Sequence, residues 1–216
     1  TLSLGTGVSE SGELSATPPG AVTTFTIEAS TNTPLLSLAA MLVQSNDLFL
    51  AGDAAGIQLF DSAGAPIPER TIALELWDAG TEANEVPGAG PNQPFRQAAP
   101  NTGPAEGVVQ PSGHGSRSLP PAAAVARVTV TESGGTFTVD VENVGADQGS
   151  FVTPLAPVFW ATHDDTYRLF REGQPALNNG LETLAEDGSP MALVGSASAD
   201  PAVGTAGAQA LTLERP

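Results

Sequence analysis

Two short runs of alternating apolar and polar residues flank a four-residue turn in the middle of the chain. Residues 125–131 and 137–142 alternate in the way that half-buried strands do, and Glu-Ser-Gly-Gly at 132–135 is a natural hairpin turn. The 24 glycines and 19 prolines are spread along the 216 residues, which indicates many turns between short strands. The pattern predicts an all-β, antiparallel sandwich.

Other segments of strand length complete this prediction, and one segment has helical spacing. Leu177, Leu181 and Leu184 recur at the spacing of an apolar helix face, which predicts a helix over 175–185 that ends near Asp187 and Gly188. A second short turn is expected after Pro190. The predicted strands cover residues 23–28, 35–43, 56–60, 71–77, 123–131, 136–142 and 158–161.

Two of the predicted strands end in carboxylates. Residues 37–47 are an apolar strand that ends at Asp47, and residues 77–85 contain Asp78 and Glu82. With residues 56–60 as the strand between them, three consecutive antiparallel strands place the ends of the first and third at the same edge of a sheet. Clustered carboxylate oxygens without a nearby basic residue suit Ca²⁺, which takes six to eight oxygen ligands.

The local sequence supports a calcium site formed by Asp47, Asp78 and Glu82. Gly80 allows the backbone to fold back so that Asp78 and Glu82 face one ion, and the Thr81 hydroxyl and the backbone carbonyls of 46–48 are further candidate ligands. Asn84 and Glu85 are expected outside the coordination shell or in solvent. The alternative is an acidic, solvated loop without an ion.

Composition narrows the classes of partner. The formal net charge is −17, from 24 acidic and 7 basic residues, which disfavours nucleic acid and, unless Ca²⁺ bridges, anionic membranes. The absence of cysteine excludes disulfides, thiol catalysis and zinc–thiolate sites. No segment approaches the roughly 18 apolar residues of a membrane span. No signal peptide begins the sequence, so an exported protein is expected to have this as its mature form.

Several motifs resemble the spondin domain, the β-sandwich of F-spondin-type matrix proteins and of many secreted bacterial proteins. The most specific strings are Trp-Asp-Ala-Gly-Thr at 77–81 and Leu-Ala-Glu-Asp-Gly at 184–188. The resemblance implies a C2-like, calcium-binding sandwich that is secreted or on the cell surface and has an adhesive or matrix role. It also implies Asp47, Asp78 and Glu82 as calcium ligands, with Glu82 in the place of an Asp in the animal proteins.

The order of these motifs is reversed relative to the family. Residues 1–131 contain the calcium-loop block, and residues 132–216 contain the hairpin strand, the Trp-Ala-Thr-His strand and the helix. The simpler explanation is one circularly permuted domain over 1–216, which is tolerated when the original termini lie close together. The alternative is exchange of halves between subunits, a head-to-tail contact that forms rings or filaments, with residues 1–17 as an added strand.

Aromatic and histidine residues have two interpretations each. Trp77 and Trp160 are candidates for a sugar-stacking platform, but a Trp within an apolar strand more often belongs to the core. His163, followed by two aspartates, is a candidate metal ligand or general base, although a lone His at a strand end is more often structural. His114 is expected to be solvated.

The acids of the predicted helix are the remaining candidates for catalysis. A pair of carboxylates across a cleft hydrolyses glycosides, whereas a solvated helix face is the simpler expectation for Glu182, Glu186 and Asp187. No nucleophile elbow, P-loop or zinc motif is present. The chain is therefore predicted to be non-enzymatic, with a hydrolase as a remote alternative.

Taken together, the sequence predicts a secreted, calcium-binding structural or adhesive sandwich, which self-assembles in the sharper version of this hypothesis. The alternative function is a calcium-dependent module that binds carbohydrate or lipid head groups through the Pro- and Gly-rich residues 86–121. A loop of that length is usually functional or pinned by other groups.

Overall fold

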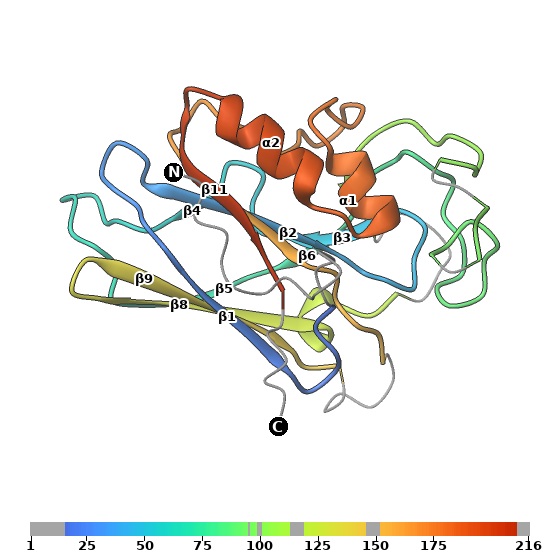
Figure 1. The fold of residues 1–216 in the computed structure, drawn as a ribbon, viewed down its shortest axis with the longest axis horizontal. Coiled ribbons are helices and arrows are strands. Elements are labelled where there is room, and N and C mark those ends of the chain that lie inside the picture. Colours follow the sequence, from blue (N-terminus) through green and yellow to red (C-terminus); the bar gives the residue numbers. More distant parts are fainter. Residues whose placement is uncertain (1–15, 95, 99–100, 113–118, 146–151, 211–216) are drawn as a thin grey trace.

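Two antiparallel sheets pack face to face, and two short helices cover the outer face of the larger sheet (Figure 1). The structure is a computed structural model that describes residues 16–94, 96–98, 101–112, 119–145 and 152–210. The predicted all-β sandwich with two short helices is confirmed. Within the described ranges, no helix is long and apolar enough to cross a membrane.

The smaller sheet is built around the predicted hairpin. Its order is β1-β9-β8-β5, and Gly134 and Gly135 form the turn between β8 and β9 with φ angles of 62° and 91°. Two successive residues with positive φ form the hairpin turn whose twist matches the flanking strands, and glycine adopts this conformation without steric cost. The strands are β1 (Val22–Ile27), β5 (Glu69–Ile72), β8 (Ala126–Ser133) and β9 (Thr136–Asn143).

The larger sheet has the order β11-β10-β2-β3-β6-β7, with β4 paired to β2 beside β3. Strand β2 is buried on both faces, since one face meets the smaller sheet and the other meets the helices. This explains its unbroken apolar sequence. The strands are β2 (Leu35–Met41), β3 (Leu48–Ala51), β4 (Ile57–Gln58), β6 (Glu75–Asp78), β7 (Gln110–Pro111), β10 (Val158–His163) and β11 (Val203–Gln209).

Helices α1 (Leu181–Asp187) and α2 (Met191–Ala199) seal the second core layer. Leu181, Leu184 and Leu193 pack with Phe49 and Phe159 of the sheet below. Helix α1 ends at Gly188, which has a φ of 69° and whose N–H donates to the carbonyl of Leu184. A glycine in this conformation terminates a helix without a steric penalty, as the sequence suggested. A short 3₁₀ helix, η1 (Ala122–Ala124), precedes β8.

Several details differ from the sequence prediction. The predicted strand 71–77 is two strands, β5 and β6, and these belong to different sheets. Strand β3 lies between β2 and β6 in place of residues 56–60, which contribute only β4 and an isolated bridge at Phe60. The first helix begins at Leu181 rather than at 175, and the turn after Pro190 is the full helix α2.

Strands from both sequence blocks are neighbours in both sheets. Strand β1 pairs with β9 and β2 pairs with β10, so the amino-terminal and carboxy-terminal blocks complete one another within one chain. Residues 1–15 of the proposed added strand lie outside the described part of the chain.

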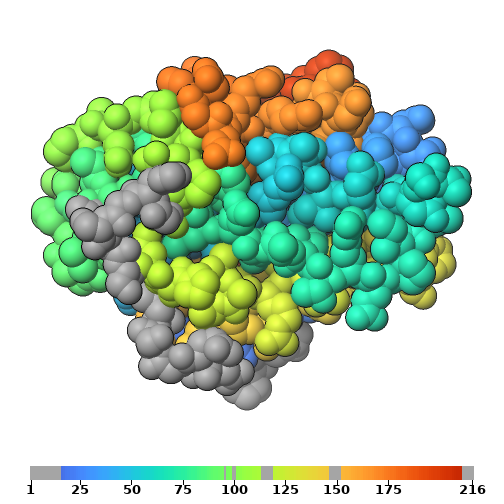
Figure 2. Space-filling view, turned by 180° about the vertical axis from the view of Figure 1, so that it is seen from behind, coloured from blue at the N-terminus to red at the C-terminus, as the bar shows by residue number. Residues whose placement is uncertain are grey.

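Residues 79–112 leave the sheets as a long excursion beside α1 (Figure 1) and form a rounded mass at one end of the molecule (Figure 2). Among the described residues of this excursion, only those of β7 join a sheet. The carboxylates predicted as calcium ligands lie where this excursion meets β2, β3 and β6, as described next.

Candidate metal centre

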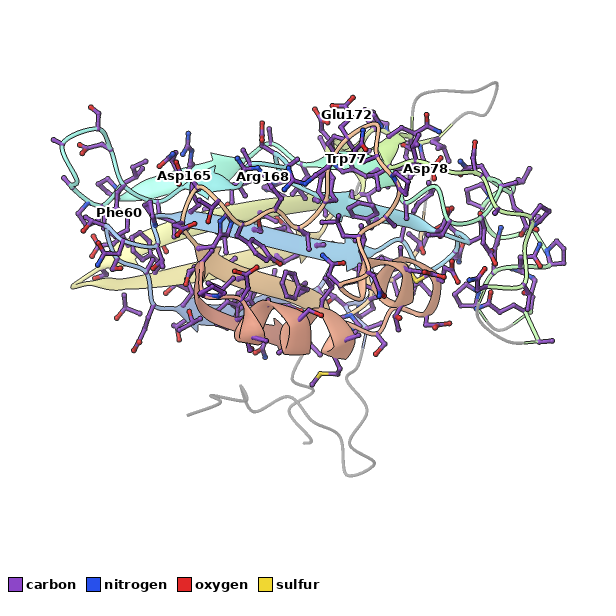
Figure 3. The ribbon with its side chains drawn as sticks, turned by 90° about the horizontal axis from the view of Figure 1, so that it is seen from above. Phe60, Trp77, Asp78, Asp165, Arg168 and Glu172 are labelled. Carbon is purple, nitrogen blue, oxygen red and sulfur yellow. The ribbon has the colours of Figure 1, made fainter. Side chains whose placement is uncertain are left out.

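Asp47 and Asp78 meet at one edge of the larger sheet. Strands β2 and β6 both pair antiparallel with β3, so they run parallel to one another and end at the same edge. Leu48 of β3 is the register partner of Asp78, and the Ala79 amide donates to the Asp47 carbonyl at 3.1 Å. Figure 3 shows Trp77 and Asp78 toward this end of the molecule and Phe60 at the opposite end. The predicted convergence of these two acids is therefore correct, although the middle strand is β3.

Asp47 is buried with only one of its two carboxylate oxygens hydrogen-bonded. Its Oδ2 accepts hydrogen bonds from the backbone amides of Thr81 (3.1 Å) and Glu82 (3.0 Å), and from the Thr81 hydroxyl at 3.4 Å. Its Oδ1 has no hydrogen-bond partner. Asp47 thus holds the loop that follows β6 and keeps one oxygen free.

Asp78 is also buried, and its partners come from its own loop. Its Oδ1 accepts the Gly80 amide at 2.7 Å, and its Oδ2 accepts the Asn84 side-chain amide and, at 3.4 Å, the Gln110 side chain. Asn84 therefore acts on Asp78 directly. The carboxylate of Glu85 accepts hydrogen bonds from the backbone amide and the side-chain amide of Asn92, and not from the partners of the two aspartates.

Gly80 makes the tight turn that the sequence predicted, although Asp78 and Glu82 do not face one common position. Its φ is +66°, and a Cβ atom at this position would overlap the backbone of Val108. Its carbonyl accepts the Gly107 amide at 2.6 Å, so the two ends of the long excursion touch here. A glycine is needed because the turn and the close approach both leave no room for a side chain.

Glu82 turns toward a different part of the excursion. Its Oε1 accepts the Gly103 amide at 2.6 Å, while its Oε2 is buried without a partner. A Cβ atom at Gly103 would lie 2.8 Å from the carboxyl carbon of Glu82, so this backbone rests directly on the carboxylate. The carboxylate of Glu82 thus holds the backbone of the excursion at Gly103.

Glu186 joins the site, and the sequence did not predict this. The acids of α1 were expected on a solvated face, but Glu186 is only 1 % exposed. Its Oε2 accepts the Asn101 amide at 2.8 Å, and its Oε1 is buried without a partner. Helical periodicity does not reveal this burial, because residue 186 lies off the Leu181 and Leu184 stripe and is covered by the excursion.

Mutual repulsion and burial perturb the acids in the direction expected for carboxylates without a cation. Burial, followed by the negative charge of Asp78, raises the pKa of Asp47 to about 8, against the lowering effect of the amides of Glu82 and Thr81. Burial likewise raises the pKa of Asp78 and of Glu186. In the described residues, the ion pair between Arg127 and Glu142 lies in the smaller sheet, and no arginine pairs with these acids.

The donor set fits a hard divalent cation. Buried carboxylates are normally paired with a cation or fully hydrogen-bonded, and three unpartnered carboxylate oxygens at one site violate that rule. As the side chains stand, no three Asp, Glu or His residues of the described ranges are arranged around a common metal position. An ion shared by Asp47, Asp78 and Glu82 therefore requires side-chain rotation.

His163 is a structural residue at the other end of β2. It pairs in register with Leu35, the first residue of β2, whereas Asp47 follows the last. Its Nδ1 is 2.6 Å from the Asp164 carbonyl, which only accepts, so Nδ1 carries the proton and Nε2 accepts from the Ser37 hydroxyl at 2.9 Å. His114 lies outside the described residues.

Histidine titration tests this assignment. Burial lowers the pKa of His163, so the folded protein keeps the ring neutral while the unfolded chain binds a proton below about 6.5. We expect this residue to reduce stability as the pH falls below that value, and its NMR titration midpoint to lie below 6.5. A midpoint at or above 6.5 would contradict the buried, neutral ring.

Trp77 belongs to the core rather than to a sugar platform. It is buried among the helix-facing residues, with its ring centroid 4.6 Å from that of Phe170. Trp160 is partly buried and stacks on Phe25 at 5.9 Å, between the two sheets.

The chain matches no protein-family model, no curated protein and no solved structure, so the likeness to spondin domains rests on the sequence motifs alone.

Proposed function

We propose that this protein is a secreted, non-enzymatic structural sandwich whose acidic loops are cross-linked by Ca²⁺, in an adhesive or matrix role. The observation that carries the proposal is the burial of Asp47, Asp78 and Glu82 without a cationic partner. Such burial is costly unless a cation is present, because each charge loses its hydration. A divalent ion converts the repulsion between the loops into attraction.

Calcium suits this site better than magnesium. The candidate ligands are all oxygen atoms, and they come from a strand end, a tight turn and a long excursion rather than from one rigid element. Ca²⁺ accepts such irregular, flexible coordination, whereas Mg²⁺ requires a near-octahedral arrangement and retains more water. Backbone carbonyls and water would complete the coordination.

The proposal predicts a calcium-dependent rise in thermal stability. An ion bound only by the folded state stabilises it by about 2.7 kcal/mol at a hundredfold excess over Kd. We expect this rise in the wild type with Ca²⁺ relative to chelator at constant ionic strength, a smaller rise with Mg²⁺, and none in Asp78→Asn. Glu172→Gln removes an exposed acid and is the matched control that keeps the wild-type response.

Two outcomes would oppose the proposal. Identical melting curves with calcium and with chelator in the wild type would refute a bound ion. An equal calcium response in Asp78→Asn and Glu172→Gln would mean that the ion binds elsewhere on this acidic chain.

A further inference from the structure

Four carboxylates of the acidic site are removed from solvent, which is twice the charge that one calcium ion neutralises. Asp47, Asp78, Glu82 and Glu186 are each at most 1 % exposed. No arginine of the described ranges forms an ion pair with them. A single divalent ion would neutralise two of the four carboxylates, and the other two would have to bind protons or a second cation, because an uncompensated buried charge is strongly destabilising.

The elements that carry the four groups divide them into two neighbouring pairs. The charge of Asp78 is the largest that acts on Asp47 and that of Glu186 also acts on it, whereas the charge of Glu82 is the largest that acts on Glu186. The first pair lies at the ends of β2 and β6. The second pair joins the loop after β6 to helix α1.

One short stretch of backbone holds the second pair. The Asn101 amide donates to Oε2 of Glu186 at 2.8 Å, and the Gly103 amide donates to Oε1 of Glu82 at 2.6 Å. Residues two apart in the chain have Cα atoms at most about 7 Å apart, so both carboxylates are brought to one place. Each therefore has one oxygen that is fixed by the backbone.

The second oxygen of each carboxylate is buried and free. Oε2 of Glu82 and Oε1 of Glu186 have no hydrogen-bond partner. Buried polar atoms in folded proteins are almost always partnered, and two such atoms on neighbouring carboxylates indicate a missing cation. The nearby backbone amides of Asn101 and Gly103 do not partner these two oxygens, since they donate to the other oxygen of each carboxylate.

We propose that Glu82 and Glu186 form a second divalent-cation site, separate from an ion at Asp47 and Asp78. The inference rests on the proposed calcium function and extends it to two ions per chain. The second ion connects helix α1, the loop after β6 and the backbone at 101–103, which are far apart in sequence. Calcium thereby fixes the long excursion against the helical layer.

Counting bound ions tests the second site directly. Equilibrium dialysis against radioactive Ca²⁺ in about 0.15 M salt, where diffuse binding to surface charge is screened, gives the number of ions per chain. We expect two ions for the wild type, one for Glu186→Gln and one for Asp78→Asn. Glu172→Gln removes the same charge from an exposed position and should retain two ions.

The outcomes separate this inference from the proposed function. One ion in the wild type would overturn the second site and leave the calcium function intact, whereas no bound ion would refute both. Two ions in Glu186→Gln would overturn the placement at Glu82 and Glu186. Circular dichroism confirms that each variant is folded, and Glu82→Gln provides the same test if Glu186→Gln does not fold.

Discussion

Raising the pH from 6.5 to 9 in the absence of divalent cations is expected to destabilise this protein, which is the reverse of what salt-bridged carboxylates produce. The group responsible is Asp47, whose pKa is raised to about 8 by burial and by the neighbouring charge of Asp78. In the unfolded chain the same carboxyl group ionises near its ordinary value of about 3.9. Over this range the folded state therefore binds more protons than the unfolded state.

The direction in which the free energy of unfolding changes with pH follows from that difference in bound protons. Stability falls with rising pH wherever the folded state is the more protonated one, and it becomes level above the folded-state pKa. Between pH 6.5 and 9, Asp47 alone accounts for a loss of about 2 kcal/mol in the free energy of unfolding. Burial also raises the pKa of Asp78 and of Glu186, so each of these groups lowers stability as the pH rises from its unfolded-state pKa to its folded-state pKa. His163 acts in the opposite direction near pH 6.5, where its ring is half protonated in the unfolded chain, but its contribution above that pH is below about 0.5 kcal/mol.

Urea unfolding at several pH values, in chelator, measures this loss. Asp47→Asn is the matched variant because it keeps the size of the side chain and cannot ionise, so most of the slope should disappear. Saturating Ca²⁺ should also level the curve, since the ion selects ionised carboxylates in the folded state and makes both states equally deprotonated. A metal-free wild type whose stability stays level or rises from pH 6.5 to 9 would show that Asp47 is not held protonated.

The edge of the sheet where the acids meet was predictable because it depends on strand direction alone. Asp47 and Asp78 each follow an apolar strand, and one intervening antiparallel strand makes these two strands parallel, so their ends coincide whichever segment lies between them. The identity of the middle strand was not predictable in the same way. Strand β3 is four residues long and follows Asp47 directly, so it merges with the loop in the sequence pattern.

The division of residues 71–77 between two sheets shows a second limit of prediction from sequence periodicity. Ile72 and Leu76 both face the space between the sheets, although one lies in β5 and the other in β6. Alternation reports that a residue faces the core, but it does not report which sheet carries the residue. The break between the strands therefore has no signal in the periodicity.

Glu186 is hidden from sequence reasoning for a further reason. Its neighbours on α1 predict an exposed position, and it is buried only because the backbone near residues 101–103 packs over the helix end. Contacts between segments about 80 residues apart are set by tertiary packing. The buried acidic cluster thus extends beyond the residues that local patterns identify.

Replacing Gly80 by alanine is expected to remove calcium binding and much of the stability. Residue 80 has a φ of +66°, which costs a non-glycine residue roughly 1–2 kcal/mol. A Cβ atom there would also lie 2.6 Å from the Val108 nitrogen and overlap the Val108 carbonyl, so the backbone itself must move. That movement breaks the hydrogen bonds that Asp47 and Asp78 receive from the amides of 80–82. We expect a total loss of at least about 3 kcal/mol.

Gly134→Ala separates the backbone strain from the clash. Gly134 has a nearly equal φ of +62°, but a Cβ atom at this position meets nothing within 4 Å. This variant should lose only about 1–2 kcal/mol and bind calcium as the wild type does. Thermal melts in chelator and dialysis against Ca²⁺ compare the two variants. Equal losses at both positions, with calcium binding intact, would mean that the turn at Gly80 tolerates a side chain and that its contact with Val108 does not shape the site.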